Sequence, residues 1–157
     1  MGTHYRGTRE EIRALDAHIK LLRCTNNVRG RLEGGLRAVG LTESQLGVLE
    51  VLVHLGPLCQ HEIGDKLLIS RANVTLVVDQ LADRGLVVRE RDTADRRRVR
   101  VLLTRDGRKL IEKLFPEHVR RIVQAMSPLT AGEQGELARL CRKLGLALAG
   151  SRGGAGG

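Results

Sequence analysis

The residues with the clearest chemistry in this sequence are the arginines of one short turn. Residues 92–98 read DTADRRR and stand between two runs rich in valine and leucine, 86–90 and 99–103. From residue 84 to residue 109 there are ten Arg or Lys against four Asp or Glu, so this segment holds six of the chain's nine net positive charges. Because cations concentrated on a hairpin attract phosphates, the turn predicts contact with a nucleic acid.

A helix is predicted directly before this hairpin. Ser70 is a residue type that caps helix N-termini, and Gly85 ends the helix, since glycine adopts the left-handed conformation at no steric cost. The apolar residues between them recur at helical spacing: Val74, Val77, Val78 and Leu81. An amphipathic helix followed by a basic hairpin is typical of a winged helix, with the helix in the major groove and the hairpin along the backbone.

The segments before Ser70 are predicted to form three helices. Capping boxes open the first two, at about 8–39 and 42–54: Thr8 with Glu11, and Thr42 with Gln45. The first has a longer apolar stripe than a small domain covers alone, so we expect a second subunit to cover part of it. A short helix over 60–67, a two-residue turn and the helix from Ser70 have the helix-turn-helix spacing.

Two more helices are predicted after the hairpin. Thr104 caps the first, and Phe115-Pro116 should bend or interrupt it, because proline removes a backbone hydrogen bond. Thr130 with Glu133 opens the last helix, whose apolar side includes Leu140 and Leu144. The glycine-rich tail, 150–157, is expected to be disordered.

Composition excludes several classes of function. The 157 residues suit one domain, and the aromatic fraction of 1% argues against readers of single-stranded nucleic acid that stack bases on aromatic rings. Three cysteines without Cys-x-x-Cys spacing suit a reducing compartment, and no signal or membrane-spanning segment is visible, which predicts a cytoplasmic protein with no membrane partner. No catalytic motif, cofactor site or metal site is predicted.

Order and motifs together resemble the MarR family of winged-helix transcriptional regulators over about residues 10–149. The most specific part, 85–110, reads GLVVRERDTADRRRVRVLLTRDGRKL, and 56–81 fits the helix-turn-helix part. The residues that match the family's wing pattern are Asp92, Asp95, Arg96, Arg97, Leu103, Thr104 and Gly107. The resemblance implies a mainly α fold with a small β-hairpin wing: a winged helix-turn-helix lobe at 42–104 and dimerisation helices at about 8–40 and 116–149.

The resemblance also implies a homodimer that binds pseudo-palindromic operators in double-stranded DNA, usually as a repressor. Small effectors of this family, often anionic and phenolic, bind between the dimer helices and the DNA-binding lobe and release the DNA. Two alternatives remain open at this point. One is a non-specific architectural DNA binder, and the other is a winged-helix module that binds an acidic protein surface.

Residue roles follow from the same resemblance. Arg97 is expected in the minor groove, with Arg96 and Arg98 on flanking phosphates and Asp95 paired with a neighbouring arginine. On the recognition helix the expected DNA contacts are Ser70, Arg71, Ala72, Asn73 and Thr75, and on the preceding helix they are Gln60 and His61. Leu76 stands where many members carry a basic residue. The competing interpretation of the wing is a solvated charged turn, and that of Ser70 is an N-cap alone.

Cys24 and the histidines raise the question of sensing. Lys20 and Arg23 would favour a Cys24 thiolate, and some family members sense oxidants, but we favour a buried or semi-buried structural thiol. A metal-sensing branch uses His, Glu and Cys, and His54, His118 and Cys24 could converge. No local spacing supports such a site, so the histidines are expected on the surface or on helix flanks.

Overall fold

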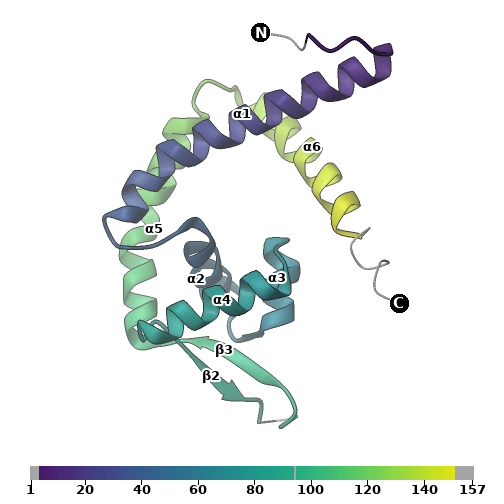
Figure 1. Cartoon of the computed structure of the whole chain (residues 1–157). Coiled ribbons are helices and arrows are strands. Elements are labelled where there is room, and N and C mark those ends of the chain that lie inside the picture. Colours follow the sequence, from purple (N-terminus) through teal and green to yellow (C-terminus); the bar gives the residue numbers. More distant parts are fainter. Residues whose placement is uncertain (1–3, 94, 151–157) are drawn as a thin grey trace. The chain divides into compact units, whose positions relative to one another are not determined.

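The computed structural model describes residues 4–93 and 95–150. The chain divides into two compact units, Met1–Gly40 and Leu41–Gly157, each of which is described by itself. The helices and the hairpin follow one another along the chain in the expected order (Figure 1). The expectation for the tail beyond residue 150 falls outside the described residues.

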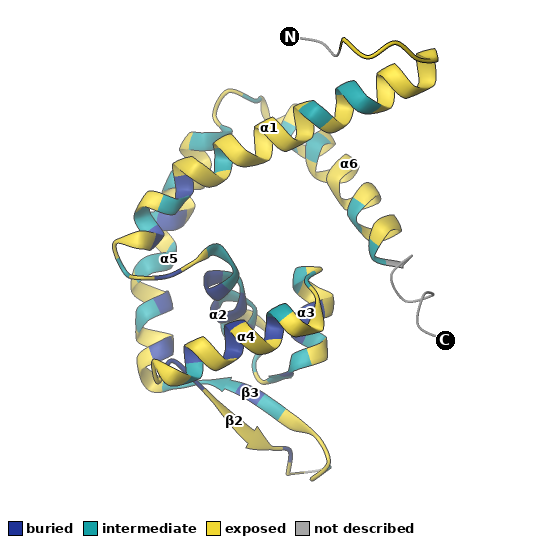
Figure 2. Ribbon diagram, viewed as in Figure 1, coloured by how far each residue is buried: buried dark blue, intermediate teal, exposed yellow. Residues whose placement is uncertain are grey.

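The first unit consists of one long helix, α1 (Arg9–Arg37). The predicted capping box is confirmed, because Glu11 N–H donates to Thr8 Oγ1 at 3.2 Å and Thr8 N–H donates to Glu11 Oε2 at 2.7 Å. Most of α1 is exposed (Figure 2), including the apolar side chains of Ile12, Leu21 and Leu22. The helix therefore presents the uncovered apolar residues that its sequence predicts.

Among the described residues, the second unit contains five helices and three strands. Its helices and strands are, in order, α2 (Glu43–Leu55), β1 (Leu58–Cys59), α3 (Gln60–Leu67), α4 (Arg71–Asp83), β2 (Val87–Arg91), β3 (Val99–Leu103), α5 (Arg105–Met126) and α6 (Ala131–Gly150). In Figure 1, α2, α3 and α4 gather at the base of the β2–β3 hairpin, which extends away from them. The hairpin begins one residue later than predicted.

The sheet has three antiparallel strands in the order β1-β3-β2. Val87 lies opposite Leu103 and Arg91 opposite Val99, so β2 and β3 pair along their full length. β1 was not predicted; its two residues pair with Val101 and Arg100 of β3. This short strand attaches the start of α3 to the hairpin.

Aliphatic side chains from α2, α3, α4, the sheet and α5 form the core. The fully buried members are Val48, Leu49, Leu52, Ile63, Val74, Val78, Leu81, Val87, Val101 and Ile111. Val74, Val78 and Leu81 lie one helical turn apart, so a single stripe of α4 faces the core and the opposite side faces solvent. The predicted core face of α4 is confirmed.

The join between α4, β2 and α5 is fixed by backbone hydrogen bonds. Gly85 has φ +67°, and the Leu86 and Gly85 N–H groups donate to Leu81 and Ala82 carbonyls, which is a Schellman motif. Thr104 Oγ1 donates to the Gly85 carbonyl at 2.7 Å and accepts from Gly107 N–H at 3.0 Å. The hairpin therefore leaves α4 and enters α5 at a defined point.

One prediction about α5 was only partly right. The helix continues from Arg105 to Met126 through Pro116, so proline does not interrupt it. Proline removes one backbone hydrogen-bond donor from the helix. Ile111 and His118, on either side of Pro116, are both buried, and their packing stabilises the helix despite the lost hydrogen bond. No helix in the described part of the chain is long and apolar enough to span a bilayer.

Candidate nucleic-acid interface

The N-terminal half of α4 places the predicted base-reading residues at the surface. Ser70 caps the helix, accepting from Asn73 N–H at 3.3 Å. Arg71, Ala72 and Thr75 are exposed and Asn73 is half-buried. The Thr75 hydroxyl donates to the Arg71 carbonyl at 3.1 Å, so within the protein it serves the helix backbone. The capping role of Ser70 is confirmed, and the residue is exposed at the surface.

Residues from α3 and α4 meet in a polar hollow. Gln60, His61, Arg71 and Thr75 line a space of about 320 Å³. Gln60 Nε2 is buried, and no partner for it is found in the described part of the chain. A buried donor without an acceptor costs free energy, so a ligand that supplies an oxygen here would be favoured. The four residues were each predicted as DNA contacts, and the fold brings them together.

The wing, defined as β2, β3 and residues 92–98 between them, is organised around a buried carboxylate. Asp92 accepts from Asp95 N–H at 3.3 Å, and its other oxygen lies 2.5 Å from Arg100 Nε. Two backbone bonds close the turn, from Asp92 N–H to the Arg98 carbonyl and from Arg98 N–H to the Asp95 carbonyl, each 2.9 Å. From the sequence, Asp92 was identified only as a residue that fits the wing pattern of the family. It was not predicted to anchor the turn.

Arg97 stands at the end of this turn, and its side chain is 93% exposed. Asp95 Oδ1 accepts from Arg97 N–H at 3.0 Å and lies 3.4 Å from Arg97 Nε. The expected pairing of Asp95 with a neighbouring arginine is therefore present. The guanidinium of Arg97 stays in solvent, where an exposed ion pair is weak and easily exchanged for a phosphate.

Arg98 differs from its neighbour. Its Nη2 donates to Glu62 Oε1 of α3 at 3.0 Å. A hydrogen bond to the Cys59 side chain, and then the negative charge of Glu62, raise the pKa of Arg98. Glu62 Oε2 also accepts from Cys59 N–H at 2.7 Å, and this hydrogen bond is the main reason why the pKa of Glu62 is lowered. One carboxylate thus caps α3 and holds the wing to it.

A second hollow continues from the first one onto the wing. Its volume is about 330 Å³, and Gln60 and His61 line both. The other residues around it are Cys59, Arg89, Arg97, Arg98 and Val99. Arg89 is also tied to α4, because its Nη2 lies 2.5 Å from Asp79 Oδ1. A continuous polar and basic surface therefore runs from α4 across α3 to the wing.

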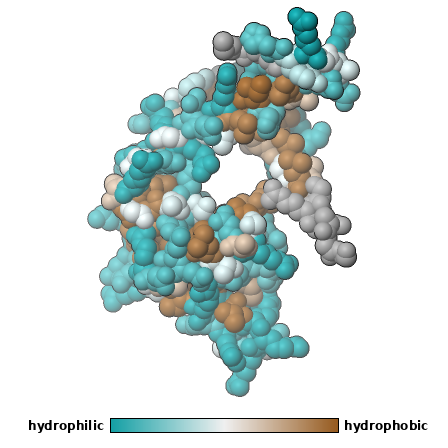
Figure 3. Space-filling view, viewed as in Figure 1, coloured by the Kyte–Doolittle hydropathy of each residue, from teal (hydrophilic) through white to brown (hydrophobic). Residues whose placement is uncertain are grey.

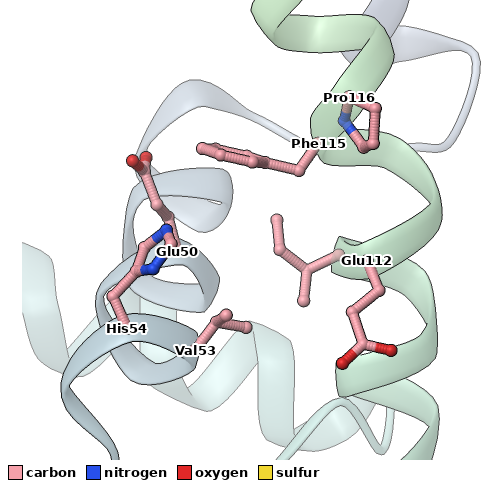
Figure 4. A pocket seen from close by; sticks show the side chains of 7 residues that line it. Glu50, Val53, His54, Glu112, Phe115 and Pro116 are labelled. Carbon is pink, nitrogen blue, oxygen red and sulfur yellow. The ribbon is translucent and has the colours of Figure 1, made fainter.

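A different kind of pocket lies between α2 and α5. It measures about 160 Å³ and is lined by Glu50, Val53, His54, Ile111, Glu112, Phe115 and Pro116. Figure 4 shows Glu50 and His54 on one helix, across from Phe115 and Glu112 on the other. The His54 and Phe115 rings meet edge-to-face, 5.8 Å between centroids. The lining of this pocket is mainly apolar, and Glu50 and Glu112 are the two acidic residues among those around it.

Two expectations about sensing residues were wrong. His118 is buried rather than on the surface, because it packs on the face of α5 that contains Ile111; burial lowers the pKa of His118 against the opposing effect of Glu50 and Glu43. Cys24 is exposed rather than buried, because it lies on a part of α1 that its own chain leaves uncovered. Within the described residues, no three His, Cys, Asp or Glu side chains are grouped to hold a metal ion.

Comparison with known proteins agrees with this geometry. The model of the MarR family matches residues 41–99. The HTH-type transcriptional regulator YkoM of Bacillus subtilis is 39% identical over 107 residues, which cover 68% of this chain and 70% of that protein. A solved structure of a probable transcriptional regulator from Pseudomonas aeruginosa is 30% identical, with a TM-score of 0.74, and covers 81% of this chain and 95% of its own.

A third relative has a regulated DNA-binding activity. It is BpsR of Bordetella bronchiseptica, whose DNA binding is regulated by 6-hydroxynicotinic acid. Its structure is 26% identical to this chain, with a TM-score of 0.76, and the alignment covers 92% of this chain and 97% of that one.

Proposed function

The chain belongs to the MarR family of transcriptional regulators, and from that premise we propose that it is a homodimeric repressor which binds a pseudo-palindromic DNA operator and leaves it when a small molecule binds. Such a regulator must reach chromosomal DNA, so we expect it in the cytoplasm. The observation that supports DNA binding most strongly is the continuous surface of the two hollows, which unites Arg71 of α4, Gln60 and His61 of α3, and Arg97 of the wing.

The surface suggests a division of roles. Arg97, exposed at the wing tip, would enter the minor groove, and Arg96 would contact a flanking phosphate. Arg98 would reach a phosphate from a guanidinium that Glu62 already positions. Arg71 and Asn73 can make bidentate contacts with guanine and adenine edges, while Ala72 and Thr75 lie beside them. Ser70, Gln60 and His61 would contact the DNA backbone, where an oxygen acceptor would satisfy Gln60 Nε2.

Dimerisation is proposed from exposed apolar side chains at both ends of the chain. In α1 these are Ile12, Leu21 and Leu22, and in α6 they are Leu140, Leu144 and Leu148. Figure 3 shows hydrophobic side chains, in brown, interrupting a surface that is otherwise hydrophilic. A dimer would place two copies of α4 about 34 Å apart, at successive turns of the DNA. Sedimentation at micromolar concentration tests this, and a stable monomer would contradict it.

The pocket between α2 and α5 is our proposed effector site. Its floor of Val53, Ile111 and Phe115 suits an aromatic ring, and the regulation of BpsR by 6-hydroxynicotinic acid supports an aromatic ligand in this family. Glu50 and Glu112 flank the pocket, so an anionic ligand would meet two carboxylates. We therefore expect a neutral phenol, whose hydroxyl can donate to a carboxylate, to bind better than a phenolic acid.

Footprinting on the DNA upstream of its own gene tests the function. We expect one protected pseudo-palindrome and an affinity that exceeds that for scrambled DNA by about a thousandfold or more. A specificity ratio near one would favour an architectural binder, and no binding would favour a protein-interaction module. Repeating the footprint with neutral phenols, phenolic acids, peroxide and zinc identifies the signal. Peroxide sensitivity that Cys24→Ser leaves unchanged would exclude Cys24 as the sensor.

A further inference from the structure

The outward face of α4 contains one large apolar side chain. All of α4 is described, and Leu76 is its only large hydrophobic residue in the exposed class, with 56% of its surface accessible. Ala72, one turn earlier on the same face, is exposed as well. A water-exposed leucine has an unfavourable hydration free energy that burial against an apolar partner would recover.

Three polar neighbours of Leu76 on α4 are engaged within the protein. The Thr75 hydroxyl donates to the Arg71 carbonyl at 3.1 Å. One turn after Thr75 and Leu76, Asp79 is paired with Arg89, and Gln80 Oε1 accepts from Gln45 Nε2 at 3.0 Å. The middle of the outward face therefore offers methyl groups more readily than free hydrogen-bonding groups. It lies next to the hollow lined by Arg71 and Thr75, so it is continuous with the DNA surface.

A major groove presents one apolar feature to such a face, the C5-methyl group of thymine. We propose that Leu76, with Ala72 beside it, reads thymine methyl groups in each half-site and is a specificity-determining residue of this regulator. The proposal rests on the proposed DNA-binding function and adds the base that this position selects. A guanine or cytosine at the same step places polar edges against Leu76 and leaves them without partners.

The size of the effect follows from the area of one methyl group. Its removal from an apolar contact is expected to weaken binding about fourfold per thymine. Arg71 and the wing contact other parts of the DNA, so the loss should not change the salt dependence of binding. The effect is therefore separable from electrostatic contributions.

Deoxyuridine, which lacks only the methyl group, provides the test. The preferred duplex is first selected from randomised DNA with the wild-type protein, and each thymine in it is then replaced by deoxyuridine. We expect one or two positions per half-site to lose affinity about fourfold. Leu76→Ala should remove this penalty, and Leu76→Gln should shift the selected base from thymine toward adenine, whose N6 and N7 pair with an amide.

The matched control is Leu55→Ala at the end of α2. Leu55 is 54% exposed and belongs to none of the proposed DNA-contacting elements, so this variant should keep the wild-type deoxyuridine penalty. The proposal is overturned if wild-type protein tolerates deoxyuridine everywhere, or if Leu76→Ala keeps the same penalty at the same positions. Selection of no preferred duplex by wild-type protein would instead overturn the proposed sequence-specific function together with this inference.

Discussion

The recognition helix α4 and the wing belong to the same lobe but are held to it by different forces. α4 buries Val74, Val78 and Leu81 completely, and the proposed DNA contacts on its outward side include one charged residue, Arg71. Among the described residues of the wing only Val87 and Val101 are buried apolar side chains, and the wing depends more on ion pairs: Arg89 with Asp79, Arg98 with Glu62, and Arg100 with the buried Asp92.

This difference suggests how the two regions divide their work. Apolar burial does not weaken as salt rises, whereas exposed ion pairs are worth about 0–1 kcal/mol and are screened by salt. We therefore expect the position of the helix to be independent of ionic strength. We expect the order of the wing, and its proposed contribution to DNA affinity, to fall as ionic strength rises.

The largest expected effect is on the helix. Leu81→Ala should lower the free energy of unfolding by about 2–5 kcal/mol, because it leaves a cavity behind a fully buried side chain. Urea denaturation at low and high salt measures it, at fixed protein concentration. The same loss is expected at both ionic strengths, and a strongly salt-dependent loss would contradict the view that apolar packing holds α4.

A smaller effect is expected in the wing. Arg98→Gln and Glu62→Gln should each speed hydrogen exchange of the wing amides about two- to fivefold, as expected for one surface ion pair. Glu62→Gln keeps an oxygen that can accept from Cys59 N–H, so the cap of α3 is preserved. Mass spectrometry of peptides from the wing and from α4 gives the rates.

The double variant and a control sharpen this test. Arg98→Gln with Glu62→Gln should exchange no faster than either single variant, because both remove the same contact. Arg96→Gln, at an exposed turn position, should leave the exchange of wing amides unchanged. Equal acceleration of α4 amides in any of these variants would show that the helix and the wing are not held separately.

The smallest expected effect lies outside both regions, at His118. Burial lowers the pKa of His118, so the folded protein favours the neutral ring. An unfolded histidine takes up a proton below about pH 6.5, so the stability due to the neutral ring is present above that pH and lost as pH falls through the lowered pKa. His118→Gln should flatten the fall in unfolding free energy as the pH is lowered below about 6.5, while the pH dependence of α4 and wing exchange stays as in wild type.

Much of the fold is predictable from local sequence because local chemistry determines it. Thr8, Thr42, Ser70 and Thr104 each cap the helix that their spacing indicates, and Gly85 has the positive φ that the end of α4 requires. In each case the partner of the residue is within a few positions along the chain. The helix-turn-helix could therefore be located before any tertiary contact was known.

The features that were missed depend on distant residues. β1 is two residues long, and only its pairing with β3 defines it. Glu62 and Arg98 are 36 positions apart, as Gln45 and Gln80 are 35 apart, so no pattern marks either contact. The burial of His118 and the exposure of Cys24 likewise depend on which helix face meets a neighbour. The sequence pattern assigns each residue to one face of its helix, but tertiary packing determines which faces are buried.

In the proposed function the wing supplies salt-dependent affinity and the helix supplies sequence choice. The most direct measurement is a salt series of binding constants for wild type, Arg97→Ala and Arg71→Ala on the operator and on a scrambled duplex. Arg97→Ala should weaken both duplexes similarly and reduce the slope of log K against log salt by about 0.9 per subunit. Arg71→Ala should weaken the operator more than the scrambled duplex. Equal losses on both duplexes for Arg71→Ala, or an unchanged slope for Arg97→Ala, would contradict the account.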